Sequence, residues 1–368
     1  MSQQPTNYSF HSTGQFRNVV KNIQQQAKFN GFDADGNVIL NELAIAPTIE
    51  YIGTVKLHGT NASIVVDEDG VISFHSKNNL LGYIKNGGFT LLSDNAEFAQ
   101  TMVRRLDSLY TIIERAKTFA KAYNGVELYP LKISGEWCGS GIQSSVGISF
   151  LPKKSLFIFG IKAGDTDQTL KQGWLPVELT YGLTNNDTQA DGFYAIIDFP
   201  TKKVTIDFQN PMFVQNTLVG YTEACEAECP VSKQLNLMSA AGKPQVLGEG
   251  LVWTPVSDEH CWDSGNWFKT KGEKHSVSKV KSVASVNVEK LNSIQEFVEY
   301  SATENRLQQG LAEVGKDQKL IGAFLSWVSK DINKEEGDVL ESNNLTMKEV
   351  GKYLSTKART WYITELNK

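Results

Sequence analysis

The sequence predicts an α+β fold in which an antiparallel-sheet domain is followed by a smaller all-helical domain. Residues 40–280 are dominated by short runs rich in β-branched and aromatic residues, separated by turn-forming residues. Residues 283–368 instead carry apolar residues at helical spacing. The pattern changes within the Ser/Val/Lys-rich stretch 276–286, so we expect one domain at 1–282 and a second at 283–368.

The β-rich part begins with a predicted hairpin. Residues 51–56 and 62–66 are β-rich runs, and the second run is followed by the turn Asp67-Glu68-Asp69-Gly70 and a returning strand at 71–76. Further strands are expected at 131–136 and 155–161. The runs 193–199 and 203–208 flank a Pro turn and are expected to pair with each other.

Helical spacing defines four further elements. Residues 95–123 form one expected helix, which Asn124-Gly125 would end. Apolar positions also recur on one helical face at 288–300 and at 320–332. Thr346-Met347-Lys348-Glu349 is a capping-box pattern before a last helix.

Composition limits the class of protein. The chain has 368 residues with 40% hydrophobic and 21% charged residues, which is ordinary for a soluble globular protein. There is no run long enough to span a bilayer and no secretory pattern at the start, so we expect a cytoplasmic protein with no membrane partner. The formal net charge of −5 disfavours polyanion binding by the whole surface, which leaves a local basic groove around Lys269, Lys271, Lys274, Lys279 and Lys281.

The four cysteines lack the rhythm of a disulfide scaffold and fit a reducing compartment. Cys225 and Cys229, with His260 and Cys261, could be considered as zinc ligands. We disfavour zinc because there is no CxxC pair and adjacent His and Cys ligands are awkward.

Lys56 is the strongest candidate for a catalytic residue. It ends a β-rich run and begins the pattern K-x-x-G-x-N, which includes His58, Gly59 and Asn61. A neutral lysine can attack the α-phosphate of a nucleotide and retain AMP as a phosphoramidate, and a glycine lets phosphate approach the backbone closely. Short patterns recur by accident, so this one needs support from the rest of the chain.

Later segments provide that support. Lys77 follows the hairpin and could hold a phosphate, although taken alone it is better interpreted as part of a solvated turn. Glu136 ends an apolar strand beside a glycine, where it could accept hydrogen bonds from ribose hydroxyls or lie on a sheet edge. Phe157 and Phe159 share one face of a strand, and either could stack on a purine or belong to the core.

The last segments place charges near the end of the β-rich part. Glu249 lies between two glycines and could reach a metal ion or a phosphate. Lys269 and Lys271 point the same way from one strand, about 7 Å apart. Two inward ammonium groups need an anion such as a triphosphate, whereas outward ones would make a solvated basic strand.

Taken in order, these segments resemble the covalent nucleotidyltransferase superfamily of polynucleotide ligases and mRNA capping enzymes. The closest likeness is to the RNA ligase 2 family of bacteriophages and kinetoplastid RNA editing. It covers residues 50–281 and is most specific at 56–61 (K-L-H-G-T-N) and 269–272 (K-T-K-G). The resemblance implies an ATP-grasp-like ligase domain and a helical domain for the RNA-dependent steps, where DNA ligases and capping enzymes usually continue into a β-barrel. It also implies a phage-infected, bacterial or organellar compartment.

The resemblance implies roles for individual residues. Lys56 would be adenylylated, with His58, Lys269 and Lys271 as the other catalytic residues. Glu249 would serve a Mg²⁺ or Mn²⁺ ion. The nucleotide would be bound by Lys56, Gly59, Asn61, Lys77, Glu136, Phe159, Glu249, Lys269 and Lys271.

Three positions depart from the family pattern. Gly160 replaces an acidic residue, Trp253-Thr254 replaces a basic one, and Lys77 replaces an arginine that would bind phosphate in a bidentate way. The choice between Phe157 and Phe159 therefore stays open, as do the groups around the metal ion.

We expect a monomeric ATP-dependent RNA ligase that joins 3′-hydroxyl and 5′-phosphate ends. The choice between a nick in a duplex and single-stranded RNA stays open. Lys56 must lose its proton, and we expect Lys269, Lys271 and the metal ion to lower its pKa. A DNA ligase, a capping guanylyltransferase and a silent RNA-binding relative are the alternatives. No role is assigned to residues 165–245.

Overall fold

The computed structural model describes residues 4–144, 146–164, 173–272, 294–343 and 345–367. The chain forms two compact units. The first comprises Met1–Gly14 and Asn18–Thr270, and the second comprises Gln15–Arg17 and Lys271–Lys368. The expected domain boundary at 282/283 lies outside the described residues.

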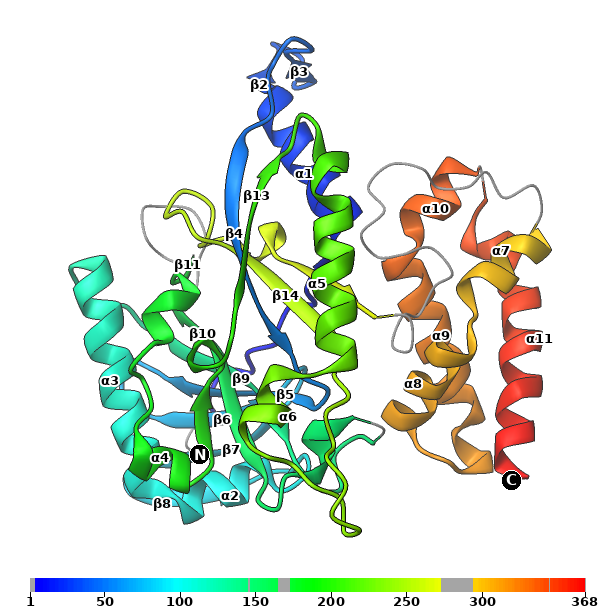
Figure 1. Ribbon diagram of the computed structural model, residues 1–368. Coiled ribbons are helices and arrows are strands. Elements are labelled where there is room, and N and C mark those ends of the chain that lie inside the picture. The colour runs from blue at the N-terminus through cyan, green and yellow to red at the C-terminus, as the bar shows by residue number, and fades with distance from the viewer. Residues whose placement is uncertain (1–3, 145, 165–172, 273–293, 344, 368) are drawn as a thin grey trace. The chain divides into compact units, whose positions relative to one another are not determined.

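The first unit is built on two β-sheets (Figure 1). In the five-stranded sheet the strand order is β1 (Gly14–Gln15), β15 (Phe268–Lys271), β14 (Gly250–Pro255), β4 (Thr48–Lys56) and β13 (Lys202–Asp207). In the larger sheet it is β11 (Gly173–Trp174), β10 (Ser155–Ala163), β9 (Leu131–Cys138), β5 (Thr60–Val66), β6 (Ile72–Ser76), β7 (Leu80–Lys85) and β8 (Gly88–Leu91). This arrangement confirms the predicted α+β class, with sheets that are mainly antiparallel.

Two helices cover one face of the larger sheet. The predicted helix at 95–123 is divided at Arg105 into α2 (Phe98–Arg104) and α3 (Leu106–Asn124), and Gly125 ends α3 with a φ of 79°. The predicted hairpin is confirmed, with Ala62 opposite Ser76. Helices and strands share one apolar core, which includes Ile64, Phe74, Phe98, Met102, Ile112, Ile113, Ile133, Trp137 and Ile158.

The expected pairing of 193–199 with 203–208 is wrong. β12 (Phe193–Ala195) pairs in parallel with β10, whereas β13 pairs with β4 in the other sheet. A short 3₁₀ turn, Ile196–Asp198, separates the two strands and sends them to different sheets. Residues 173–245 thus supply β11, β12 and β13 and three helices: α4 (Asn186–Ala190), α5 (Gln215–Ala227) and α6 (Pro230–Gln234).

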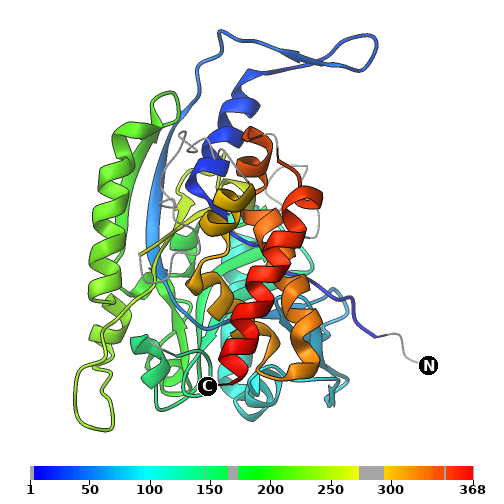
Figure 2. The ribbon, with the colours of Figure 1, turned by 90° about the vertical axis from the view of Figure 1, so that its right-hand side faces the viewer.

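The chain enters β4 through α1 (Phe16–Lys28) and a hairpin of β2 (Phe29–Phe32) and β3 (Val38–Leu40). This hairpin extends beyond the two sheets (Figure 2). Its apolar side chains are largely solvent-exposed, for example Phe32 at 64%.

The second unit is helical over its described C-terminal part. It contains α7 (Ile294–Ser301), α8 (Glu304–Val314), α9 (Ile321–Glu335), α10 (Gly337–Ser342) and α11 (Met347–Leu366). The predicted helix at 320–332 corresponds to α9, and the Thr346 capping box is confirmed. The helix expected at 288–300 is described only from Ile294 onward, as α7. In the described part of the chain, none of the helices is long and apolar enough to cross a membrane.

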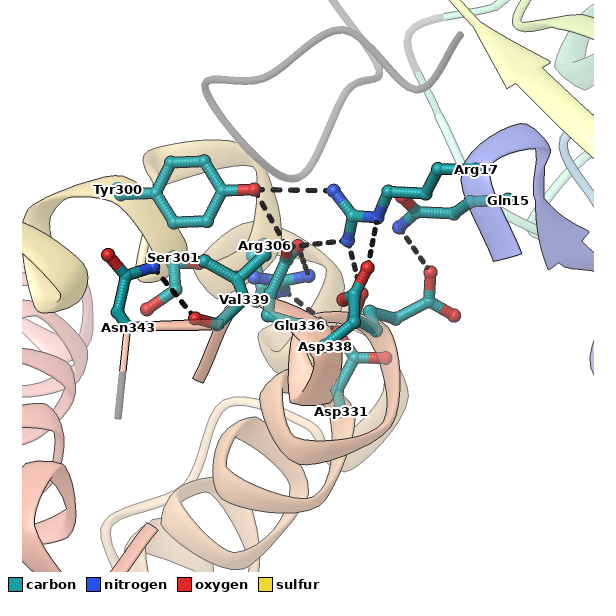
Figure 3. Close-up of polar contacts among 11 residues, drawn as sticks. Gln15, Arg17, Tyr300, Ser301, Arg306, Asp331, Glu336, Asp338, Val339 and Asn343 are labelled. Carbon is teal, nitrogen blue, oxygen red and sulfur yellow. Dashed lines mark hydrogen bonds and ion pairs between the residues drawn. The ribbon is translucent and has the colours of Figure 1, made fainter. Parts of the chain in front are cut away.

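A buried charge network holds this unit together (Figure 3). Glu336 and Arg306 are both 0% exposed, and their side chains are 3.0 Å apart. Glu336 also contacts Arg17 at 2.9 Å and accepts a hydrogen bond from the Tyr300 hydroxyl, while Arg306 Nε pairs with Asp331. Removing one partner of such a pair leaves the other charge buried and unpaired, which typically lowers the free energy of unfolding by about 3–5 kcal/mol.

Candidate functional site

The loop of residues 57–59 carries the chain from one sheet to the other. β4 ends at Lys56 in the five-stranded sheet, and β5 begins at Thr60 in the larger one. Lys56 is opposite Gly250 in the β4–β14 ladder, so Glu249 lies just beyond the paired residue. The Lys56 ammonium contacts Glu249 Oε2 at 2.7 Å, and the two side chains are 21% and 1% exposed.

The same carboxylate reaches a second residue of the loop. His58 Nδ1 lies 3.4 Å from Glu249 Oε2. Glu249 therefore holds both Lys56 and His58, two residues that the sequence placed in one motif.

Gly59 brings this loop against the second carboxylate. Its backbone N–H donates a hydrogen bond to Glu136 Oε1 at 3.0 Å. A Cβ atom on Gly59 would lie 2.5 Å from the Trp137 carbonyl oxygen and 2.6 Å from Cys138 Sγ, so only glycine fits. Asn61 is directly opposite Glu136 in the β5–β9 ladder.

Asn61 and Lys77 complete this side of the site. The Oδ1 atom of Asn61 is buried and has no hydrogen-bond partner among the described residues. Such an atom is costly to leave unpaired, which suits a position that receives a ligand. Lys77 is exposed just after β6, and its charge acts to lower the pKa of Glu136.

The charged groups that surround Lys56 shift its pKa in the direction opposite to our expectation. Burial alone would lower the pKa of Lys56, but attraction by Glu249 and Glu136 outweighs burial, and the pKa is raised. The expected lowering by Lys269 and Lys271 is therefore wrong for the protein without a nucleotide, because two carboxylates are the dominant neighbouring charges. Burial raises the pKa of Glu136 to about 7, despite attraction by Lys56.

This electrostatic arrangement predicts that Glu249→Gln lowers the pKa of Lys56. At a pH below the pKa of Lys56, a larger fraction of Lys56 should be neutral in the mutant than in the wild type. Acetylation of Lys56 by a small amount of an amine-reactive acetylating reagent should then be about tenfold faster in the mutant. Peptide mass spectrometry at several pH values measures this rate. Glu42→Gln is a matched control, since it breaks the exposed 2.6 Å pair with Lys28, and Lys28 acetylation should change less than about twofold. Unchanged or slower acetylation of Lys56 would contradict the prediction.

Lys269 lies on the same face of the five-stranded sheet as Lys56. Trp253 stands opposite Gly53 and covers it, and Trp253 Nε1 donates to Thr270 Oγ1 at 3.2 Å, so these three residues share one face. Side chains alternate along a strand, which places Lys56 and Lys269 on the other face.

Alternation gives Lys271 the same orientation as Lys269 on β15. Both side chains are half-buried.

The two candidate aromatic residues have different environments. Phe157 is 1% exposed and stacks on Tyr194 at 5.0 Å between ring centroids, so it belongs to the core. Phe159 is half-buried and lies at a bulge in β10, where the register shifts between Ile158 and Gly160. Of the two, Phe159 is the ring that remains accessible.

Sequence reasoning missed two aromatic neighbours of the site. Phe10 contacts Phe159 at 5.4 Å, and Phe10 contacts Trp174 at 5.7 Å between ring centroids. No local pattern could have indicated them, because they are distant in sequence from the motifs. Among the described residues, no group of three or more His, Cys, Asp or Glu side chains could hold a metal ion, and all four cysteines are free and buried.

Fold and site together define a two-sheet domain in which Lys56, Glu249 and Glu136 lie at the connection between the sheets, while Lys269 lies on the same sheet face as Lys56. A sequence profile for RNA ligase matches residues 49–271, which is more than half of the chain. The chain belongs to the RNA ligase family.

Two other comparisons complete the findings. No curated protein sequence matches the chain. Among solved structures it is similar to mutants of the Naegleria gruberi RNA ligase with ATP and Mn, at 16% identity and TM-scores of 0.39 and 0.41. A structure of that ligase with PPi is similar at 15% identity and a TM-score of 0.37. These matches cover 72–73% of this chain but only 57–58% of the Naegleria chains.

Proposed function

We propose that this protein is an ATP-dependent RNA ligase that acts through AMP bonded to Lys56. The observation that carries the proposal is the position of Lys56. It lies at the connection between the sheets, within 2.7 Å of the buried Glu249 and on the sheet face that carries Lys269. Gly59, Glu249 and Glu136 lie around it. The glycine lets a phosphate approach the backbone closely, and a carboxylate can accept hydrogen bonds from ribose hydroxyls.

In the first step the neutral Lys56 amine attacks the α-phosphorus of ATP. A nitrogen–phosphorus bond forms, the bond to the β-phosphate oxygen breaks, and pyrophosphate leaves while the lysine loses a proton. Lys269 and Lys271 stabilise the negative charge that develops on pyrophosphate. Nucleotide binding must also separate Lys56 from Glu249, since that ion pair favours the protonated amine.

Other residues orient the nucleotide. Glu136 accepts hydrogen bonds from the ribose, and Phe159 stacks on adenine. The buried Oδ1 of Asn61 accepts a hydrogen bond that no described residue supplies. Lys77 and His58 contact the phosphates.

A divalent ion fits this set of residues if Glu249 and the bound nucleotide coordinate it together. Glu249 is a hard oxygen ligand, and Mg²⁺ or Mn²⁺ commonly combines one or two carboxylates with phosphate oxygens and water. Glu249 would hold the ion together with the nucleotide, which suits a site with no cluster of three protein ligands in the described residues. When bound, the ion supplies positive charge to the phosphates.

Two RNA-dependent steps follow. The 5′-phosphate of RNA attacks the lysyl-AMP phosphorus, which frees Lys56 and leaves a 5′–5′ pyrophosphate linkage. A 3′-hydroxyl then attacks the RNA phosphorus, a phosphodiester forms, and AMP leaves. The C-terminal helices α7 to α11 serve these steps, in the manner of the RNA ligase 2 type.

Sealing of a nicked RNA duplex tests this function. With ATP and Mg²⁺ or Mn²⁺, the protein should convert a 5′-phosphate, 3′-hydroxyl nick into a continuous strand, and a 3′-phosphate nick should stay open. Parallel reactions with single-stranded RNA, nicked DNA and GTP distinguish the substrate classes. Sealing of DNA alone, or use of GTP alone, would contradict the proposal.

A further inference from the structure

Residues 7–10 lie along the site face of the larger sheet. The Phe10 N–H donates to the Lys77 carbonyl at 2.7 Å, and Asn7 Nδ2 donates to the Asn78 carbonyl at 2.9 Å. Tyr8 packs edge-on against the ring of His75, with ring centroids 5.7 Å apart. The segment is therefore tied to the end of β6 and to the turn after it.

Lys132 ties the same segment to β9. Its ammonium donates to the Ser9 carbonyl at 2.9 Å and lies 5.4 Å from the centroid of the Phe10 ring. Lys132 is only 7% exposed, whereas Phe10 is half-buried and Ser9 is exposed. A cation over a half-buried aromatic ring is a favourable contact that helps to fix the ring's position.

Phe10 contacts Phe159 at a bulge in β10, where Phe159 has no partner residue on the neighbouring strand. The bulge between Ile158 and Gly160 leaves Phe159 without a residue opposite it in the β9 ladder. Phe10 packs edge-on against Phe159, with the ring planes 70° apart, and packs similarly against Trp174. The N-terminal segment thus supplies support that the ladder lacks.

We propose that Phe10 is a positioning residue for the nucleotide site. It holds the Phe159 ring in the orientation for stacking on the base, and its backbone N–H holds the main chain of Lys77. One segment thereby orients a base contact and a phosphate contact of the same nucleotide. This inference rests on the proposed function, because it takes Phe159 and Lys77 as nucleotide contacts.

Phe10→Ala tests the inference through nucleotide affinity. We expect the Kd for ATP and the KM for ATP in Lys56 adenylylation to rise about three- to tenfold, the range set by loss of aromatic contacts. The kcat of adenylylation should stay within about twofold, since Phe10 touches no reacting atom. Phe10→Tyr keeps the ring and should restore most of the affinity.

Phe32→Ala is the matched control. It removes a T-shaped contact of similar geometry, with Phe29 at 5.4 Å and 71°, from the exposed hairpin of the same unit. We expect no change in Kd or KM for this variant. Thermal unfolding of both variants shows whether loss of stability accounts for any effect.

The outcomes are distinct. An unchanged Kd in Phe10→Ala, or a lower Kd because the segment obstructs the base, would overturn the inference. So would an equal rise in Phe32→Ala. If the wild-type protein binds ATP but is not adenylylated, the proposed function fails and the Kd comparison still decides the role of Phe10. If it binds no ATP, both fail.

Discussion

Lys56→Ala is expected to abolish the transfer of label from α-phosphate-labelled ATP to the protein, a loss of at least about a thousandfold in rate. The mutant would lack the proposed nucleophile, the Lys56 Nζ atom, and covalent catalysis has no substitute when its nucleophile is removed. Gel electrophoresis of the labelled, denatured protein measures the effect. Sealing of nicked RNA should be lost with it, because the second step consumes the lysyl-AMP adduct and the third step needs the capped RNA that the second step makes.

Two control variants isolate the role of the amine. Lys56→Arg keeps a positive charge beside Glu249 but should be equally inactive, since a guanidinium does not lose its proton near neutral pH. Lys28→Ala removes another lysine that is paired with a glutamate, at 2.6 Å from Glu42, and should keep full labelling. Substantial labelling of either Lys56 variant would show that a different residue carries AMP.

Lys269→Ala has the second largest expected effect, a loss of about 10²- to 10³-fold in the rate of adenylylation. Lys269 lies on the Lys56 face of the sheet, and removing one preorganised group that stabilises transition-state charge has a cost of this size. The single-turnover rate of lysyl-AMP formation at saturating ATP measures it, and the fall should lie mainly in the rate and not in ATP binding.

Lys203→Ala provides the comparison within the same sheet. Lys203 lies on β13, is 59% exposed and pairs with Glu50 at 3.2 Å, so its removal should leave the rate unchanged. A loss below about threefold for Lys269→Ala, or equal losses for the two variants, would remove Lys269 from the mechanism.

Local pattern predicted those parts of the fold in which neighbours in sequence are neighbours in space. The β5–β6 hairpin follows from alternation around Asp67-Glu68-Asp69-Gly70, and the last helix follows from its capping box. The partners of β12 and β13 could not be predicted, because both runs have strand character and the choice of sheet depends on distant residues. The break at Arg105 was missed for a similar reason, since the apolar spacing continues through it.

In the candidate site, too, local features could be predicted from the sequence and contacts between distant residues could not. The motif around Lys56 and the alternation of Lys269 and Lys271 are readable from sequence. The contact of Lys56 with Glu249 depends on the register of β4 against β14, which sequence does not specify. For that reason the predicted direction of the Lys56 pKa shift is wrong for the protein without nucleotide and metal ion. The contact of Phe10 with Phe159 was missed because the two residues are distant in sequence.

Mass spectrometry of peptides from protein incubated with ATP and Mg²⁺ or Mn²⁺ tests the central claim most directly. We predict that the peptide containing Lys56 gains the mass of one AMP and loses it again when pyrophosphate is added. An AMP adduct on any other residue, or no adduct on protein that binds ATP, would show that Lys56 is not the nucleophile.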